Sequence, residues 1–104
     1  MEAMTFPQFE ALMENTYAAA NWDWKETADQ VIKTMAAKGI RFTADDVWQV
    51  LDGLPVETKT RSALGPVMLR LERQGVIRKT GALRRSRRAQ NHRDKWEWIG
   101  AQNG

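Results

Sequence analysis

The spacing of apolar residues predicts four helices, because each stripe recurs three or four positions apart and so lies on one helical face. The helices are expected to begin near Pro7, after Asp23, at Thr43 and near residue 61. The stripes are Phe9, Leu12, Met13 and Tyr17; Trp24, Ala28, Val31, Ile32 and Met35; Val47, Val50 and Leu51; and Leu64, Val67, Met68 and Leu71.

Local signals mark the ends of these helices. Asp23 precedes Glu26 by three residues, and Thr43 precedes Asp46 by three, which is the spacing of a capping box. The second, third and fourth helices are each followed by a glycine suited to a helix end: Gly39, Gly53 and Gly75.

The last part of the chain has a different pattern. The fourth helix should span about residues 61–74, with Pro66 in its first turns, where a missing N–H is tolerated best. Beyond it, the short alternating runs VIRKTG (76–81) and KWEWIG (95–100) favour strands, with a long basic loop between them. The sequence therefore predicts a mainly α fold with a small β-hairpin, of the α+β class.

Charge is unevenly distributed along the 104 residues. The first 58 include 4 basic and 10 acidic residues, whereas the remaining 46 include 12 basic and 3 acidic ones. A strongly basic second half indicates a polyanionic partner that touches only that half. The alternative is an ordinary solvated charged surface.

From Trp24 to Gly100 the chain resembles a winged helix-turn-helix domain, in which three helices precede a two-stranded wing. The resemblance is carried by FTADDVWQVL (42–51) and RSALGPVMLRLERQGVIRKTG (61–81). The basic wing followed by a tryptophan strand is also similar to small proteins of phages and prophages. The chain departs from the family in its long connection at 53–60 and in Pro66, which falls inside the helix that would read DNA.

The resemblance implies a non-enzymatic protein that binds double-stranded DNA, as a bacterial or phage transcriptional regulator or accessory factor. The helix at 61–74 would enter the major groove, and the arginine-rich wing at 83–95 would contact phosphates or the minor groove. The residues implied in DNA binding are Thr58, Lys59, Arg61, Ser62, Pro66, Arg70, Arg73, Arg84, Arg85, Arg87, Arg88, Arg93 and Lys95.

The arginine run itself fits phosphate, because a guanidinium offers several donors in a fixed plane and stays charged. Other interpretations of the run stay open. It can be a disordered basic loop that keeps the protein soluble, or a segment that orders on RNA. It can also belong to a protein–protein interaction module, such as a phage inhibitor of a host nucleic-acid enzyme.

Two tryptophans, Trp96 and Trp98, share one face of the last predicted strand. Aromatic side chains among basic residues can stack on the bases of single strands. Paired tryptophans on a terminal strand more often cover the core of a small domain, so we predict core packing for both. We predict the same for Trp22, Trp24 and Trp48.

The residue types argue against catalysis. There is no cysteine, and the one histidine, His92, lies near Asp94 without an accompanying nucleophile. We therefore expect no enzyme activity, no cofactor and no metal. The carboxylates considered as metal ligands were Glu10, Glu14, Asp45, Asp46 and Asp52, of which Asp45 and Asp46 already suit a helix start.

We expect a helical extension at 1–22, a winged helix-turn-helix domain at 23–100 and a flexible tail at 101–104. The extra helix either caps the core of its own subunit or pairs two subunits as a homodimer. No apolar run is long enough to span a membrane or resembles a signal peptide, so a cytoplasmic location without a membrane partner is expected.

Overall fold

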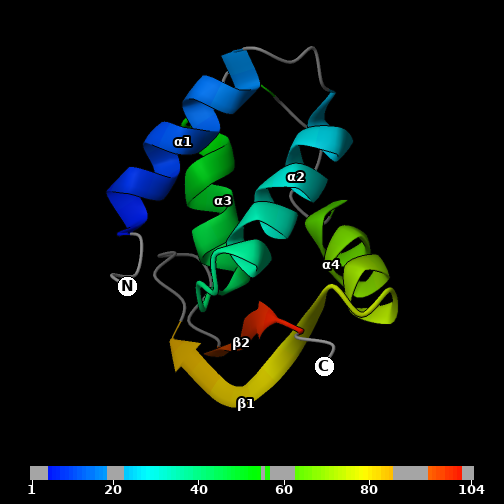
Figure 1. Ribbon diagram of the computed structural model, residues 1–104. Coiled ribbons are helices and arrows are strands. Elements are labelled where there is room, and N and C mark those ends of the chain that lie inside the picture. The colour runs from blue at the N-terminus through cyan, green and yellow to red at the C-terminus, as the bar shows by residue number, and fades with distance from the viewer. Residues whose placement is uncertain (1–4, 19–22, 55, 57–62, 86–93, 102–104) are drawn as a thin grey trace.

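The structure is a computed structural model and describes residues 5–18, 23–54, 56, 63–85 and 94–101. Within these ranges, four helices come first, α1 (Phe6–Ala18), α2 (Trp24–Ala37), α3 (Ala44–Asp52) and α4 (Leu64–Arg73). The strands β1 (Ile77–Arg85) and β2 (Asp94–Gly100) follow and pair antiparallel. The predicted class, mainly helical with a small hairpin, is confirmed (Figure 1).

The helix ends lie where the local signals placed them. The Asp23 carboxylate accepts a hydrogen bond from the N–H of Glu26 at 2.8 Å, and the Asp46 carboxylate accepts one from the N–H of Thr43 at 2.9 Å. After α2 and α4, Gly39 (φ 69°) and Gly75 (φ 76°) adopt the left-handed backbone that glycine allows.

The apolar stripes of α2, α3 and α4 meet in one core. All the predicted stripe residues of these three helices are buried except Trp24, which is half-buried against Trp48 with ring centroids 5.7 Å apart. Burial of this kind stabilises a domain by about 1.5–3 kcal/mol for each large apolar side chain.

The first helix contributes to the same core. Phe9 and Met13 of α1 are fully buried, and Leu12 is half-buried. The side chain of Tyr17 lies outside the described part of the structure. The α1 stripe therefore caps the core of its own chain, while dimerisation through this helix stays a prediction.

The hairpin is longer than predicted. Its register pairs Lys79 with Trp98 and Leu83 with Trp96, so three residues of β1 lie opposite the single residue Glu97. This bulge lets β1 continue to Arg85, which corrects the prediction that the strand ends at Gly81 and that Arg84 and Arg85 lie in the loop.

Phe42, in the connection between α2 and α3, extends the hairpin by an isolated antiparallel bridge to β2. Phe42 and Trp98 exchange two backbone hydrogen bonds, of 2.9 Å and 2.7 Å, which attach the α2–α3 connection to β2.

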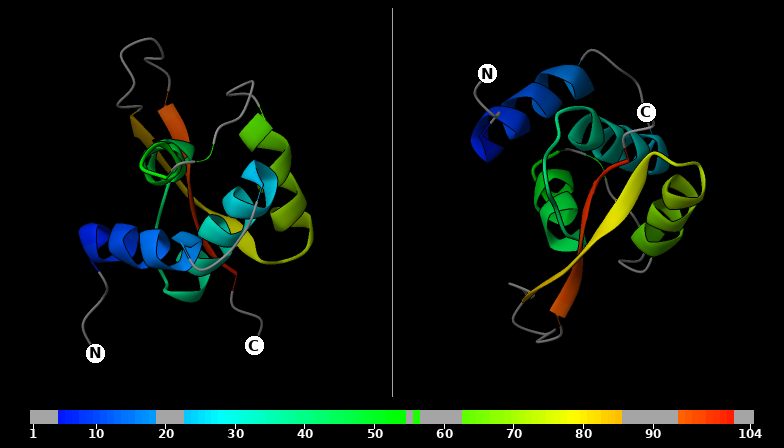
Figure 2. Two further views of the ribbon diagram at one scale, coloured as in Figure 1. Left: turned by 90° about the horizontal axis from the view of Figure 1, so that it is seen from above. Right: turned by 60° about the horizontal axis from the view of Figure 1, so that its bottom comes forward.

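The arrangement of the elements leaves α4 uncovered by α1. In Figures 1 and 2, α1 and α4 lie on opposite sides of α2, and β1 runs from the end of α4 beneath the helices to the far side. None of the helices in the described ranges has the length and apolar character needed to cross a membrane.

Candidate nucleic-acid interface

The outward face of α4 carries small residues in its first turn, one exposed leucine, and basic residues in its last turn. Leu64, Val67, Met68 and Leu71 turn inward and are buried, which leaves the opposite side of the helix exposed. That side presents Gly65, Pro66, Leu69 and Arg73. Pro66 is the third residue of the helix, where its missing N–H breaks no hydrogen bond within the helix.

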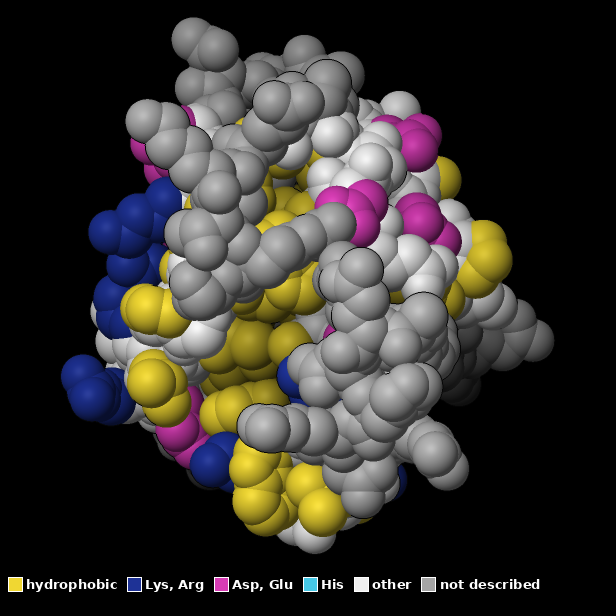
Figure 3. All heavy atoms as spheres, turned by 180° about the vertical axis from the view of Figure 1, so that it is seen from behind, with side chains coloured by type: hydrophobic (Ala, Val, Ile, Leu, Met, Phe, Trp, Pro, Cys, Tyr) yellow, Lys and Arg dark blue, Asp and Glu magenta, His cyan; other side chains and the backbone are white. Residues whose placement is uncertain are grey.

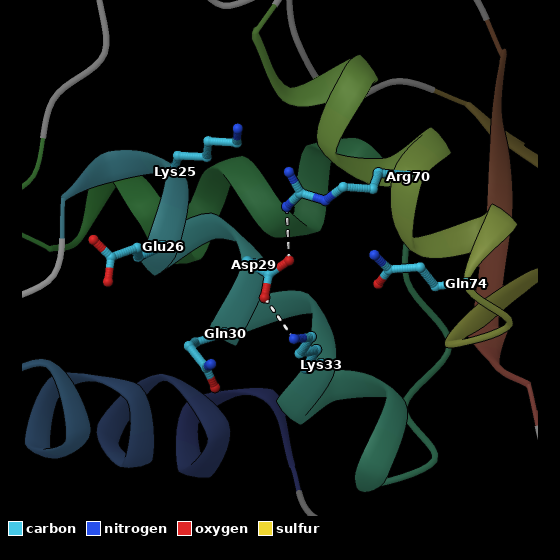
Figure 4. Close-up of a pocket in the computed structure, with 7 residues that line it drawn as sticks. All are labelled: Lys25, Glu26, Asp29, Gln30, Lys33, Arg70 and Gln74. Atoms are coloured by element: carbon cyan, nitrogen blue, oxygen red, sulfur yellow. Dashed lines mark hydrogen bonds and ion pairs between the residues drawn. The ribbon is translucent and has the colours of Figure 1, made fainter.

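The flank of α4 carries an ion pair to α2. The Arg70 guanidinium donates to the Asp29 carboxylate at 2.9 Å, and the Lys33 ammonium lies 2.9 Å from the other oxygen of the same carboxylate (Figure 4). Burial raises the pKa of Asp29, but the hydrogen bonds and charges of Lys33 and Arg70 outweigh it and hold the pKa below its ordinary 3.8.

This ion pair lies in a groove of about 340 Å³ between α2 and α4. Figure 4 shows Arg70 pointing from α4 toward Asp29 on α2, with Lys25 nearby on α2 and Gln74 on α4. Because Asp29 engages two of the cations, the groove is poorly suited to hold an anion. Arg70 stays partly exposed, at 37% of its side chain.

Arg84, assigned to phosphate from the sequence, has partners within the chain. Its guanidinium donates to the Asp46 carboxylate on α3 at 2.7 Å, and its Nε lies 3.4 Å from the Glu97 carboxylate on β2. Asp46 and Glu97 are both buried. In the structure, Arg84 therefore fastens the hairpin to the start of α3, a contact that no local sequence signal indicates.

The two tryptophans of β2 differ in burial. Trp98 is 7% exposed and belongs to the core, as predicted. Trp96 is 47% exposed, so the prediction of core packing is wrong for this residue. Among the described residues, Trp96 belongs neither to the buried core nor to the partly buried side chains packed against it.

A lysine missed by the sequence analysis lies beside both rings. The Lys79 ammonium is 4.9 Å from the Trp96 ring centroid and 5.5 Å from that of Trp98. The signal that could have found it is the alternation of β1, which places Lys79 on the same face as buried Ile77 and exposed Leu83.

The remaining predicted contacts divide into two groups. Arg85 is the last residue of β1, and Lys95, half-buried in β2, is the register partner of Arg84. The others lie outside the described residues: Thr58, Lys59, Arg61, Ser62, Arg87, Arg88 and Arg93. Trp22 and His92 also lie outside them.

The face that carries α4 and the hairpin is seen in Figure 3. Hydrophobic side chains gather at its centre and along its lower edge, where the hairpin lies, and Lys and Arg side chains line the side on which α4 lies. In the described ranges, no three His, Cys, Asp or Glu side chains are grouped so that they can hold a metal ion.

Comparisons with protein-family models, with curated proteins and with solved structures found no match to this chain.

Proposed function

We propose that this protein binds double-stranded DNA without catalysing a reaction, as a winged helix-turn-helix regulator or accessory factor of a bacterium or phage. α4 is the recognition helix and the hairpin is the wing. The order of elements supports the proposal, since α2, the Phe42 bridge, α3, α4 and the hairpin follow one another as they do in that family.

The observation that carries the proposal is the outward face of α4. Its first turn is small and has no acidic side chain, with Gly65 and Pro66 exposed, so a backbone can approach this part of the helix closely. Arg70 and Arg73 follow in its last turns. In helix-turn-helix docking, the start of the recognition helix meets base edges while basic side chains nearby hold phosphates.

The internal partners of Arg84 change the part that the wing plays. We assign Arg84 to holding the wing in position, and we assign phosphate contacts to Arg85, Arg87 and Arg88, which follow it in the sequence. We also assign phosphate contacts to Arg93 and Lys95, which precede Trp96 in the sequence.

The test is a binding titration of labelled duplexes of random sequence, repeated over a range of salt concentrations. If the surface neutralises roughly 4–6 phosphates, the association constant falls about 10²–10³-fold between 50 and 200 mM salt. Absence of binding to duplex DNA at low salt and micromolar protein would refute the proposal.

A second candidate function is a protein–protein interaction module. It is favoured by three large apolar side chains exposed on the described surface, Leu69, Leu83 and Trp96. A purified one-to-one complex with a protein partner, together with an absence of DNA binding, would favour this function.

Competition between duplex DNA and structured RNA of equal length separates the DNA proposal from the RNA alternative.

A further inference from the structure

One face of the hairpin passes from the core into solvent. Near the helices it is buried, with Ile77 at 1% and Trp98 at 7% exposure. Farther along the hairpin, Leu83 is 52% exposed and its register partner Trp96 is 47% exposed. Leu83 and Trp96 therefore form an apolar pair on the part of this face that the helices leave uncovered, named here the wing platform.

The wing platform is held in place from the other face of the hairpin. Within the bulge, the Thr80 hydroxyl donates to the Glu97 carboxylate at 2.9 Å and accepts from the N–H of Ala82 at 3.2 Å. Glu97 also contacts Arg84, which is fastened to Asp46. The positive φ of Gly81, 94°, completes the bulge that brings Leu83 opposite Trp96. A platform fixed in this way loses little conformational entropy when a ligand binds.

Its charge favours an anionic ligand. The Lys79 ammonium lies over the Trp96 ring, 4.9 Å from its centroid, on the side of the platform nearer the core. An aromatic ring with one ammonium group close to it matches a nucleotide, whose planar base stacks on the ring while its phosphate meets the cation.

The size of the wing platform argues against a second copy of the chain. A tryptophan and a leucine, each about half exposed, offer on the order of 200 Å² of contact area. A stable protein interface buries about 800 Å² on each partner. The platform has the dimensions of one or two bases instead.

We propose that the wing platform stacks an unpaired nucleobase next to the duplex that α4 contacts. This inference rests on the proposed DNA-binding function, and it narrows the ligand to DNA with a single-stranded segment beside a duplex, such as a tailed or forked end. Paired bases inside a duplex are stacked on one another, so their faces are not offered to Trp96.

The experiment compares three labelled ligands: a blunt duplex, the same duplex with a short single-stranded thymidine tail, and the tail alone. The wild-type protein is expected to bind the tailed duplex about tenfold more tightly than the blunt one, as one stacked base contributes. Trp96→Ala is expected to lose this preference while binding the blunt duplex as the wild type does. Trp96→Phe, which keeps an aromatic face, is expected to retain most of it.

Leu69→Ala is the matched control, because Leu69 is as exposed as Trp96, at 47%, but lies on α4. This variant is expected to bind the blunt and the tailed duplex more weakly than the wild type, by the same factor for both. Thermal unfolding of each variant checks that the fold is kept, which we expect since both side chains are half exposed.

The outcomes separate the two proposals. Equal binding of blunt and tailed duplexes by the wild type, or equal weakening of both by Trp96→Ala, overturns the stacking inference and leaves the DNA-binding function standing. Binding of the tail alone that Trp96→Ala abolishes, without any duplex binding, supports stacking and refutes the duplex proposal. No binding to any of the three ligands overturns both.

Discussion

At the scale of single residues, Arg84 shows why a basic cluster in a sequence does not translate directly into a binding surface. Its neighbours in the sequence are arginine and leucine, and only the fold brings it to Asp46 and Glu97. The Asp46 carboxylate also accepts from the N–H of Thr43, so one carboxylate both caps α3 and anchors the hairpin.

Replacing Arg84 with alanine should therefore reduce stability. The Asp46 carboxylate is buried and loses a charged donor, but the arginine is 43% exposed, so we expect a loss of only about 1 kcal/mol. For a domain of this size the melting temperature should fall by roughly 5 °C. Thermal unfolding followed by circular dichroism measures the change.

Arg73→Ala is the control for this prediction. Arg73 is exposed on α4 and has no ion-pair partner among the residues that the structure describes. Its replacement should change stability by less than about 0.5 kcal/mol and should weaken duplex binding. Equal stability of the two variants would contradict the anchoring role of Arg84.

The ion pairs of Asp29 lead us to expect that the stability of the fold depends on pH. Its pKa is lowered in the folded state, so its ionised form stabilises the fold above the ordinary pKa of 3.8, and this contribution is lost as the pH falls through the folded-state value. Asp29→Asn should be less stable than the wild type near neutral pH, by at most about 1 kcal/mol. The two proteins should converge below pH 3.8, as urea unfolding across the acidic range can measure. A stability difference that persists at low pH would contradict the ionic origin.

At the scale of elements, the helices could be predicted from the sequence and the hairpin only in outline. The caps of α2 and α3 and the glycines after α2 and α4 act within a few residues, so their signals can be read along the chain. The length of β1 depends on a bulge at Gly81 and on the contact of Arg84 with α3. Interactions between residues distant in sequence leave no local pattern.

The candidate site likewise has features that could be predicted from the sequence and features that could not. The outward face of α4 followed from its helical period, which is why Pro66 and Arg73 are exposed as expected. The different burial of Trp96 and Trp98 could not be predicted, because it depends on which part of β2 packs against the core, and only Trp98 belongs to that core.

Two glycine-to-alanine variants test how closely the elements pack. A Cβ on Gly100 would lie 2.9 Å from the carbonyl carbon of Ala36, so Gly100→Ala should push β2 away from α2 and destabilise the fold by about 1–3 kcal/mol.

Gly65 in α4 has no atom near its added Cβ, and Gly65→Ala should stabilise the fold by about 0.5–1 kcal/mol. Chemical denaturation measures both.

Gly65→Ala has a second expected effect on α4. If a groove approaches the backbone there, the added methyl group should weaken duplex binding although the protein has become more stable. A stabilised variant with unchanged DNA affinity would contradict close approach at this position.

At the scale of the whole molecule, the acidic and basic halves of the sequence are folded around one core. α1 contributes Phe9 and Met13 to that core from the side opposite α4, which leaves the outward face of α4 free (Figures 1 and 2). The central claim is that this face and the hairpin act together on a duplex. The net charge is −6 over the first 58 residues and +9 over the remaining 46, the part of the sequence that includes α4 and the hairpin.

The most direct test of that claim is a titration of the isotopically labelled protein with a short DNA duplex, in which NMR records the chemical shifts of the backbone amides. We predict that the largest shift changes fall on Gly65, Leu69 and Arg73 and on the hairpin, while amides of α1 stay unchanged. Changes centred on α1, or changes on the hairpin with none on α4, would contradict the claim.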